Sequence, residues 1–534
     1  MKRAPTLLLC WILLLSIAYS ALSVIRHNHF QSGGFDLGIY DQAVWQYSRF
    51  QFPYNTIKER FILGDHLTLT LPLLAPLFWL WEDVRILLVF QAFWISFSAL
   101  AIYKVAIVRL SGKGRMDPRV RGDDKRGGGD ERNNEIVALC LAVVYSLFPG
   151  IQYAVFFDFH PVIIGVGLLP WIGYFLESNR KKLLWSAIIL LLLTQENMGV
   201  ALAGLGFIYF IRLRSHSRES GNPEIKDKDW IPDQVGDDRL RRAGIWFMVV
   251  GILYSLFALR IIAVFSPAGF EYQPVFPNTI PSFIKQLFDS PEKRQSWFFS
   301  FAWFSFLPLL SPGAFLAVAL DLSQYFVSGP AFARMWSPFA HHRAIVGVFL
   351  TLGTLNVLQW IDKKTGRGWI PAFAGMTKKR ISVEYISLIL LVVIVVFQYI
   401  WHLPLNKLVK AEYWKEEVWM TDNRKLFALV PADASIASQQ SLVPHLSHRK
   451  EIYLVYPVLH DYDDKRCGQT KCWWLDFAGK PQYLVIDLHP NQWVTQLLET
   501  NEHFSEAVVN MEKAGRIRLV NRINNAKLYE VVKK

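Results

Sequence analysis

Apolar runs separated by short polar stretches make up the chain as far as residue 403. Several runs approach or exceed the roughly 18–20 apolar residues that a helix needs to cross a bilayer. The pattern predicts a mainly α-helical, polytopic membrane protein with about eleven spans. The expected spans are residues 7–25, 86–108, 136–149, 162–178, two short spans within 183–213, and then 243–265, 297–310, 313–327, 344–360 and 384–402.

The basic loops set the expected orientation of these spans. Lys and Arg gather in the loops between apolar runs, as the positive-inside rule describes for cytoplasmic loops. The run at 67–81 is apolar but short and holds two prolines, and a span there would move the basic loop 109–135 outside. We therefore expect an interfacial or re-entrant segment within a first outer loop, residues 26–85. The amino terminus is then cytoplasmic and the carboxyl terminus outside, in a bacterial inner (plasma) membrane.

The hydrophobic and polar pattern changes after residue 403. Short runs at 435–438, 451–455 and 483–487 predict strands, residues 501–514 predict a helix, and 516–532 predict a terminal hairpin. We expect a transmembrane domain over 1–403 and an extracytoplasmic α/β domain over 404–534. Cys467 and Cys472 stand close together there and, outside the cytoplasm, are able to form a disulfide, whereas a zinc site would need two further ligands.

Three polar, Gly- and Pro-containing segments interrupt the expected cytoplasmic loops at 113–134, 215–242 and 362–380. Two of them share the start Trp-Ile-Pro, and two share the end Gly-Asp-Asp. They resemble translated palindromic repeat elements inserted into bacterial reading frames. We interpret them as tolerated passengers in exposed loops.

The composition raises the question of nucleic-acid binding. The chain is 52% hydrophobic and 15% aromatic, yet it carries a formal charge of +13. Such a charge often indicates nucleic-acid binding. The basic residues here follow the loops between spans, and no nucleic-acid-binding motif accompanies them. We expect membrane lipid as a partner and no nucleic acid, and the oligomeric state stays open.

Ionisable side chains at the predicted outer face are the candidates for chemistry, because charge at or within a bilayer is costly. The candidates are Asp36, Asp41, Asp65, His66, Asp158, His160, Glu196, His341, His342 and Arg343. The plain alternative is that loop carboxylates cap helices, and Asp36 is well placed as such an N-cap. Asp158 and His160 are carboxylate and imidazole ligands of the kind that divalent cations use, so Mg²⁺ or Mn²⁺ is a candidate cofactor.

Three blocks carry a resemblance to a known family. Residues 35–42 (FDLGIYDQ), 63–66 (LGDH) and 157–161 (FDFHP) resemble signature blocks of the DUF2079 family of bacterial integral membrane proteins, and 444–449 (PHLSHR) is also similar to it. The layout resembles the GT-C superfamily of glycosyltransferases, which use polyprenyl-phosphate sugars and bear an essential acidic residue in the first outer loop. Asp36 departs from that pattern because it is not part of a paired Asp-Glu motif.

The resemblance implies a membrane glycosyltransferase with a GT-C-like fold and a lipid-linked sugar donor. Asp36 is the expected base, with Asp41 second. Asp65, His66, Glu196, His341, His342 and Arg343 are the expected substrate-binding residues, and Asp158 and His160 the expected metal ligands. A transporter or flippase, or a non-catalytic envelope scaffold, are the alternatives. The sequence identifies neither the sugar nor the acceptor.

Overall fold

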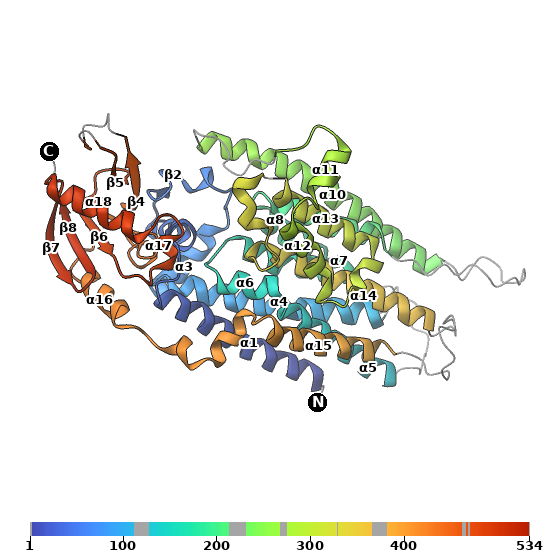
Figure 1. Cartoon of the computed structure of the whole chain (residues 1–534). Coiled ribbons are helices and arrows are strands. Elements are labelled where there is room, and N and C mark those ends of the chain that lie inside the picture. Colours follow the sequence, from blue (N-terminus) through green and yellow to red (C-terminus); the bar gives the residue numbers. More distant parts are fainter. Residues whose placement is uncertain are drawn as a thin grey trace, which may run out of the picture.

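A computed structural model describes residues 3–111, 128–212, 231–266, 275–327, 329–365, 382–461, 466–467 and 470–532. Figure 1 shows two parts, an elongated helical bundle and a sheet domain at one end of it. Helix α1 (Arg3–Asn28) runs along the bundle, so that its carboxyl end lies beside the sheet domain and its amino end far from it.

The bundle is built from helices of unequal length. They are α4 (Arg85–Ser111), α5 (Gly128–Ser146), α6 (Pro149–Phe156), α7 (Val162–Glu177), α8 (Lys181–Leu192), α9 (Met198–Phe210), α10 (Ile231–Phe265), α11 (Ile280–Gln286), α12 (Pro291–Ala302), α13 (Pro312–Phe326), α14 (Ala344–Thr365) and α15 (Val383–Ile400). Between them lie the 3₁₀ segments η4 (Leu307–Leu310), η5 (Pro330–Trp336) and η6 (His341–Arg343). The mainly helical fold class is therefore confirmed.

Five helices in the described ranges are long and apolar enough to cross a membrane; they include α1, α4 and α15. Helices α5 and α6 add a sixth span if they are counted together, although they meet at an angle of 45°. Pro149 starts α6 and cannot continue the hydrogen bonding of α5, which explains the bend. The predicted total of about eleven spans stays a prediction.

Two local predictions concern short apolar segments. Two short helices, α8 and α9, lie where two short spans are expected within 183–213, and the turn at 193–197 separates them. That both cross the membrane stays a prediction. The run 67–81 forms η3 (Leu71–Leu74) and α3 (Ala75–Leu80), which together are too short to span a bilayer. This agrees with a non-spanning segment, and its position relative to the membrane stays a prediction.

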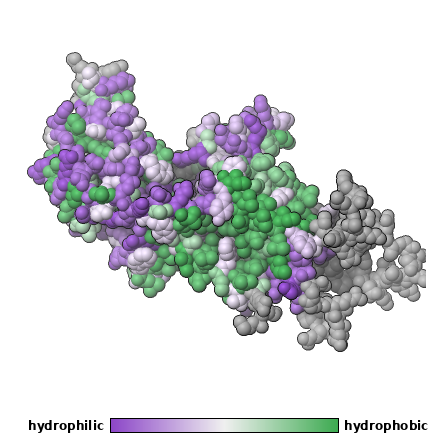
Figure 2. Space-filling view, turned by 60° about the horizontal axis from the view of Figure 1, so that its bottom comes forward, coloured by the Kyte–Doolittle hydropathy of each residue, from purple (hydrophilic) through white to green (hydrophobic). Residues whose placement is uncertain are grey.

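Figure 2 shows a green band of hydrophobic side chains across the middle of the bundle on the face in view, with hydrophilic surface on both sides of it. The exposed apolar residues come mainly from α1, α10 and α15, including Leu13, Phe257 and Val392. An apolar belt of this kind is unfavourable in water and favourable against lipid tails. The surface therefore agrees with a multi-pass membrane protein.

A folded connecting segment lies between the bundle and the sheet domain. It contains the π-helical turn η1 (Gly34–Gly38), α2 (Ile39–Ser48), β1 (Tyr54–Asn55), β2 (Arg60–Phe61) and η2 (Ile62–Gly64). The backbone N–H of Gly34 donates to the Gln440 carbonyl at 2.8 Å, and the Thr56 hydroxyl donates to the Ile452 carbonyl at 2.6 Å. These bonds attach the segment directly to the sheet domain.

The sheet domain has six strands in the order β5-β4-β3-β6-β8-β7. Its elements are α16 (Val418–Phe427), β3 (Ile436–Ser438), η9 (Val443–His445), β4 (Ile452–His460), β5 (Cys472–Phe477), β6 (Tyr483–Asp487), α17 (Trp493–Gln496), α18 (Asn501–Lys513), β7 (Ile517–Ile523) and β8 (Ala526–Val531). β3 pairs in parallel with β4 and β6, and the remaining pairs are antiparallel. The predicted strands, helix and hairpin are confirmed, and β5 is an additional strand.

Alternate residues of the strands serve two different cores. On β4, Tyr453 and Val455 pack with α18, whereas Leu454 joins the core that continues into the bundle. This follows from the period of two along a strand, which sends neighbouring side chains to opposite faces. One face of the sheet is thus covered by α18, and the other faces α16 and the connecting segment.

Cys467 and Cys472 form a disulfide beside the β4–β5 hairpin, which resolves the question that the sequence left open. The segments η7 (Pro404–Val409) and η8 (Ala411–Trp414) connect α15 to the sheet domain. Most of the three inserted segments, 113–134, 215–242 and 362–380, lies outside the described residues. Their described ends belong to α5, α10 and α14.

Candidate functional site

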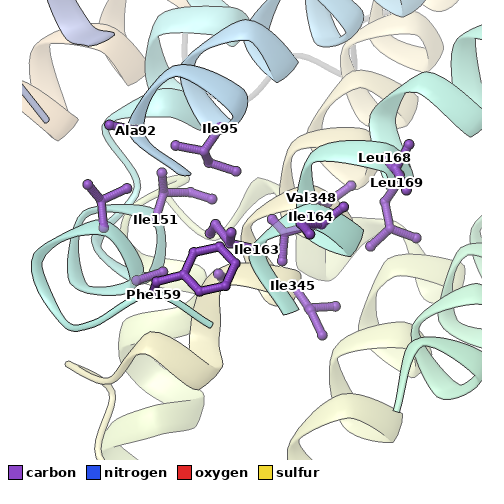
Figure 3. Close-up of a cluster of buried hydrophobic side chains, with 14 of the residues drawn as sticks. Ala92, Ile95, Ile151, Phe159, Ile163, Ile164, Leu168, Leu169, Ile345 and Val348 are labelled. Carbon is purple, nitrogen blue, oxygen red and sulfur yellow. The ribbon is translucent and has the colours of Figure 1, made fainter. Parts of the chain in front are cut away.

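The turn between α6 and α7, residues 157–161, is anchored by one aromatic side chain. Phe159 is fully buried and packs into the apolar core formed by α4, α6, α7 and α14, where Figure 3 shows it close to Ile163. Asp158 and His160 flank this anchor. Because the buried ring of Phe159 anchors the turn, the side chains of Asp158 and His160 are kept in fixed positions.

Asp158 is buried, and its charge is matched by Arg26 at the end of α1. Arg26 Nη1 donates to Asp158 Oδ1 at 2.6 Å and to the Phe157 carbonyl at 2.9 Å. The other carboxylate oxygen accepts from the backbone N–H of Gly33 at 2.8 Å. Asp158 therefore ties together α1, the α6–α7 turn and the residue that precedes η1.

Asp36 lies in η1 and is the more open of the two carboxylates. Its Oδ1 stands 3.3 Å from His160 Nε2, and its side chain is 30% exposed. The residue before η1 is Gly33 and no side chain caps the turn, so the plain alternative of Asp36 as an N-cap is wrong. A Cβ at Gly33 would lie 3.2 Å from Asp36 Oδ2 and 3.7 Å from Asp158 Oδ2, which places both carboxylates around this glycine.

A row of imidazole rings extends from His160 into η6. The His160 and His341 rings stack with centroids 4.7 Å apart, and the His341 and His342 centroids are 3.8 Å apart. Helix α6 approaches η6 very closely, since a Cβ at Gly150 would lie 2.5 Å from the Arg343 carbonyl. Glycine at position 150 therefore allows the imidazole row to lie beside the α6–α7 turn.

Arg343 follows these histidines and is fully buried. Its Nη2 donates to the Met335 carbonyl at 2.8 Å, and the guanidinium carbon lies 4.7 Å from the centroid of the Tyr325 ring. Within the described part of the chain, Nε and Nη1 have no hydrogen-bond partner. The charge of Arg343 interacts with that of the buried Asp321 carboxylate, and its N–H groups without partners are available to donate hydrogen bonds to an anion.

A second ion pair joins the connecting segment to the α8–α9 turn. His66 Nδ1 lies 2.7 Å from Glu196 Oε1, and the backbone N–H of Leu67 donates to the other oxygen at 3.2 Å. Burial lowers the pKa of His66, but the charge of Glu196 and the hydrogen bond to it raise that pKa to about 9. Asp65 is 3.8 Å from Lys58 Nζ. His66 lies close enough to His342 for their charges to interact.

Nine of the ten predicted residues therefore form connected groups where the connecting segment meets the bundle. We call them the polar cluster: Asp36, Asp65, His66, Asp158, His160, Glu196, His341, His342 and Arg343. They come from segments far apart in the sequence. What brings them together is the packing of η1, η2, η6 and the turns at 157–161 and 193–197.

Asp41 is the tenth residue, and it faces the sheet domain instead. It is fully buried, it accepts a hydrogen bond from the Ser447 hydroxyl, and its Oδ1 lies 3.1 Å from His448 Nε2. Burial lowers the pKa of His448, while the charge of Asp41 and their hydrogen bond raise it above its ordinary value. The catalytic role predicted for Asp41 stays a prediction.

The model of a family described as predicted membrane protein (DUF2079) matches residues 26–507. The chain belongs to the DUF2079 family. The match covers the polar cluster, the connecting segment and most of the sheet domain, so the resemblance in the three sequence blocks is confirmed. No curated protein matches the chain.

Several partners in this DUF2079 protein were not singled out from the sequence. They are Arg26, which pairs with Asp158; Lys58, which lies near Asp65; Gln195, whose Nε2 is 3.1 Å from His66 Nδ1; and Gln440, whose Oε1 accepts from the Phe35 N–H. Of these four residues, only Arg26 could have been selected from the sequence. A cation at the end of an apolar span indicates an acidic partner nearby. The others depend on tertiary packing.

Asp158 and His160 are the predicted ligands of a divalent cation. Asp158 is engaged by Arg26 and Gly33, whereas His160 faces Asp36. In the described ranges, no three His, Cys, Asp or Glu side chains form a group able to hold a metal ion. The predicted divalent cation stays a prediction.

Proposed function

We propose that this DUF2079 protein is a membrane glycosyltransferase that moves a sugar from a polyprenyl-phosphate donor to an acceptor of the cell envelope on the outer face. The observation that carries the proposal is a partly open carboxylate, Asp36, and a buried guanidinium, Arg343, at the two ends of a row of imidazoles. The imidazoles of His160, His341 and His342 stand between them.

The chemistry follows from these groups. Asp36 removes the proton of an acceptor hydroxyl, and the hydroxyl oxygen forms a bond to the anomeric carbon of the donor sugar. The bond from that carbon to the phosphate oxygen breaks, and its electron pair leaves with the lipid phosphate. Arg343 and His342 stabilise the negative charge on the phosphate. His160, 3.3 Å from Asp36, is placed to relay the proton away.

Two further observations support the membrane side of the proposal. The apolar belt around the bundle provides surface for a polyprenyl tail. The disulfide between Cys467 and Cys472 is of a kind that persists in oxidising compartments, which favours a sheet domain outside the cytoplasm. The connecting segment binds that domain, so the polar cluster belongs to the same side.

The first experiment is transfer of labelled sugar from a panel of polyprenyl-phosphate donors, with wild type and Asp36→Asn purified in parallel. We expect transfer by the wild type and a loss of roughly 100- to 10,000-fold in the variant, the range for a general base. Asp433→Asn makes the same change on an exposed part of the sheet domain and should leave transfer unchanged. Full activity in Asp36→Asn would remove Asp36 as the base.

One observation favours transport as a second candidate. The 45° break between α5 and α6 resembles the discontinuous helices that line transport pathways. Flux of labelled polyprenyl-phosphate sugar across proteoliposomes, in the absence of any acceptor, tests it. Flux without transfer would favour a flippase, whereas transfer without flux would favour the glycosyltransferase. If neither flux nor transfer is observed, the protein is an envelope scaffold.

A further inference from the structure

A cleft of about 570 Å³ lies between the connecting segment and the edge of the sheet domain. Its volume falls in the range of about 300–1,000 Å³ that small-molecule sites occupy. The lining residues are Phe35, Thr56, Ile57, Lys58, Glu59, Arg60, Leu454, Tyr456, Asp476, Phe477 and Ala478. Two separate parts of the chain thus form its walls.

The strand wall presents an aromatic ring beside a carboxylate. Tyr456 on β4 and Asp476 on β5 are direct cross-strand partners, so their side chains stand on the same face of the sheet. Leu454, two residues earlier, is on that face too and is buried against the bundle core. Tyr456 lies beyond that contact and is 42% exposed. The exposed ring is therefore directed into the cleft.

The opposite wall supplies a second ring. Lys58 Nζ stands 5.0 Å from the centroid of the Phe35 ring and 3.8 Å from Asp65 Oδ1. Phe35 immediately precedes Asp36 in η1. The cleft therefore begins one residue from the proposed base, and Lys58 connects it to the polar cluster.

The charges of the lining indicate what kind of ligand fits. Lys58 and Arg60 are balanced by Glu59 and Asp476, so the lining has no net charge. Asp476 is also held by His460 at 3.5 Å and Arg466 at 3.4 Å. A balanced lining gives little attraction for an anion or a cation. It offers paired donors and acceptors between aromatic faces, which suits a neutral ligand rich in hydroxyl groups.

We propose that this cleft binds the acceptor of the reaction as a neutral saccharide, with one hydroxyl directed toward Asp36. Tyr456 and Phe35 contact the faces of the sugar rings, and Asp476 accepts hydrogen bonds from hydroxyl groups. The role of this saccharide as the acceptor rests on the proposed function. The binding of a saccharide to the cleft stands without it.

The test measures binding without any donor. Full-length protein in nanodiscs is titrated with trisaccharides of glucose, mannose, galactose and N-acetylglucosamine, and saturation-transfer NMR reports contact. We expect at least one to bind, with affinity about tenfold lower in Tyr456→Ala and in Asp476→Asn, since each loses a contact worth about 1.4 kcal/mol. Trp493→Ala changes an aromatic residue of similar exposure, 43%, outside the cleft and should bind normally.

The outcomes separate this inference from the proposed function. Normal binding by Trp493→Ala together with weak binding by the two cleft variants supports the cleft, whatever the transfer assay gives. Binding that is equal in all variants overturns the cleft as the site. Tighter binding of a sulfated trisaccharide, or no binding of any neutral one, overturns the neutral saccharide.

Discussion

Asp36 and Asp41 stand five residues apart in one helical stretch, and their surroundings are opposite. Asp36 is 30% exposed and faces an imidazole at 3.3 Å. Asp41 is fully buried, and both of its oxygens are engaged by the sheet domain, through Ser447 and His448. The stretch therefore has an open face toward the polar cluster and a closed face toward the sheet.

The difference explains how one short segment serves two purposes. A carboxylate with both oxygens engaged stabilises the contact between two parts of the protein, and taking up a proton would break that contact. A carboxylate with an open oxygen can accept a proton without loss of structure. The closed face holds the segment in position, and the open face is available for chemistry. The following predictions separate the two faces.

The largest effect on stability is expected at Asp158, which binds Arg26 and the residue before η1 and so stabilises the open face. Asp158→Ala leaves the buried guanidinium of Arg26 without its partner. Removal of one member of a buried ion pair costs roughly 3–5 kcal/mol. Unfolding of the purified protein, followed by circular dichroism in SDS titrations, should show this loss.

The matched control removes both charges. Arg26→Leu combined with Asp158→Leu leaves no buried charge unpaired, so it should recover a large part of the stability. Asp36→Asn, whose carboxylate is partly open, should change the free energy of unfolding by less than about 1 kcal/mol. Equal losses for Asp158→Ala and Asp36→Asn would contradict the distinction between a supporting and an open carboxylate.

The pH dependence of stability should report on His66 and Glu196. The pKa of His66 is raised in the folded state to about 9, from about 6.5 in an unfolded chain. A raised histidine pKa stabilises fully below the unfolded value, and that stability disappears as the pH rises through the folded value. We expect a contribution of about 3 kcal/mol at pH 6 that is mostly lost by pH 10.

Glu196→Gln provides the comparison for this pH profile. Without the carboxylate, the charge that raises the pKa of His66 is absent, so stability should fall less steeply between pH 7 and 10, and the slope that remains includes the contribution of His448. Thermal unfolding across that range in both proteins is the measurement. A slope of the same size in Glu196→Gln and in wild type would assign the pH dependence to groups other than His66.

The sequence predicted the bundle and the sheet domain well, because both depend on local patterns. Apolar runs separated by breaks gave α4, α7 and α15 within a few residues. Short runs with strand character gave β3 and β6. The strand β5 was missed because Cys472-Trp-Trp-Leu-Asp-Phe477 follows a loop and shows no clear alternation of apolar and polar positions.

The polar cluster was predicted as a set of residues but not as an arrangement. The rule that charge near a membrane is costly selects acidic residues, wherever they are in the chain. It cannot separate Asp36 from Asp41, because their environments depend on Ser447 and His448, about 400 residues later in the chain. The pairing of Asp158 with Arg26 depends in the same way on long-range packing.

A moderate effect is expected at the closed face. Asp41→Asn removes the charge that accepts from Ser447 and His448, and a lost hydrogen bond to a charged group costs about 2 kcal/mol. The sheet domain should then separate more readily from the connecting segment. Limited proteolysis should release it sooner than in wild type or in Asp36→Asn. Unchanged proteolysis in Asp41→Asn would show that other contacts hold the closed face.

The smallest effect on stability is expected where the sheet domain reaches the open face. Gln440 Oε1 accepts from the Phe35 N–H at 3.3 Å, and its Nε2 would lie 3.0 Å from a Cβ at Gly33, beside Asp36. Gln440→Ala keeps the backbone bond to Gly34 and should cost no more than about 1 kcal/mol.

Its effect on transfer should be larger than its effect on stability, because η1 loses a contact that fixes the position of Asp36. We expect a fall in kcat of about tenfold, equivalent to about 1.4 kcal/mol, with the KM for donor unchanged. Gln440→Glu is the informative partner variant. Its added negative charge favours protonation of the neighbouring carboxylates, so the acid limb of the pH–rate profile should move to higher pH. An unchanged pH–rate profile would show that the residue at position 440 does not affect Asp36. The sheet domain would then contact only the closed face.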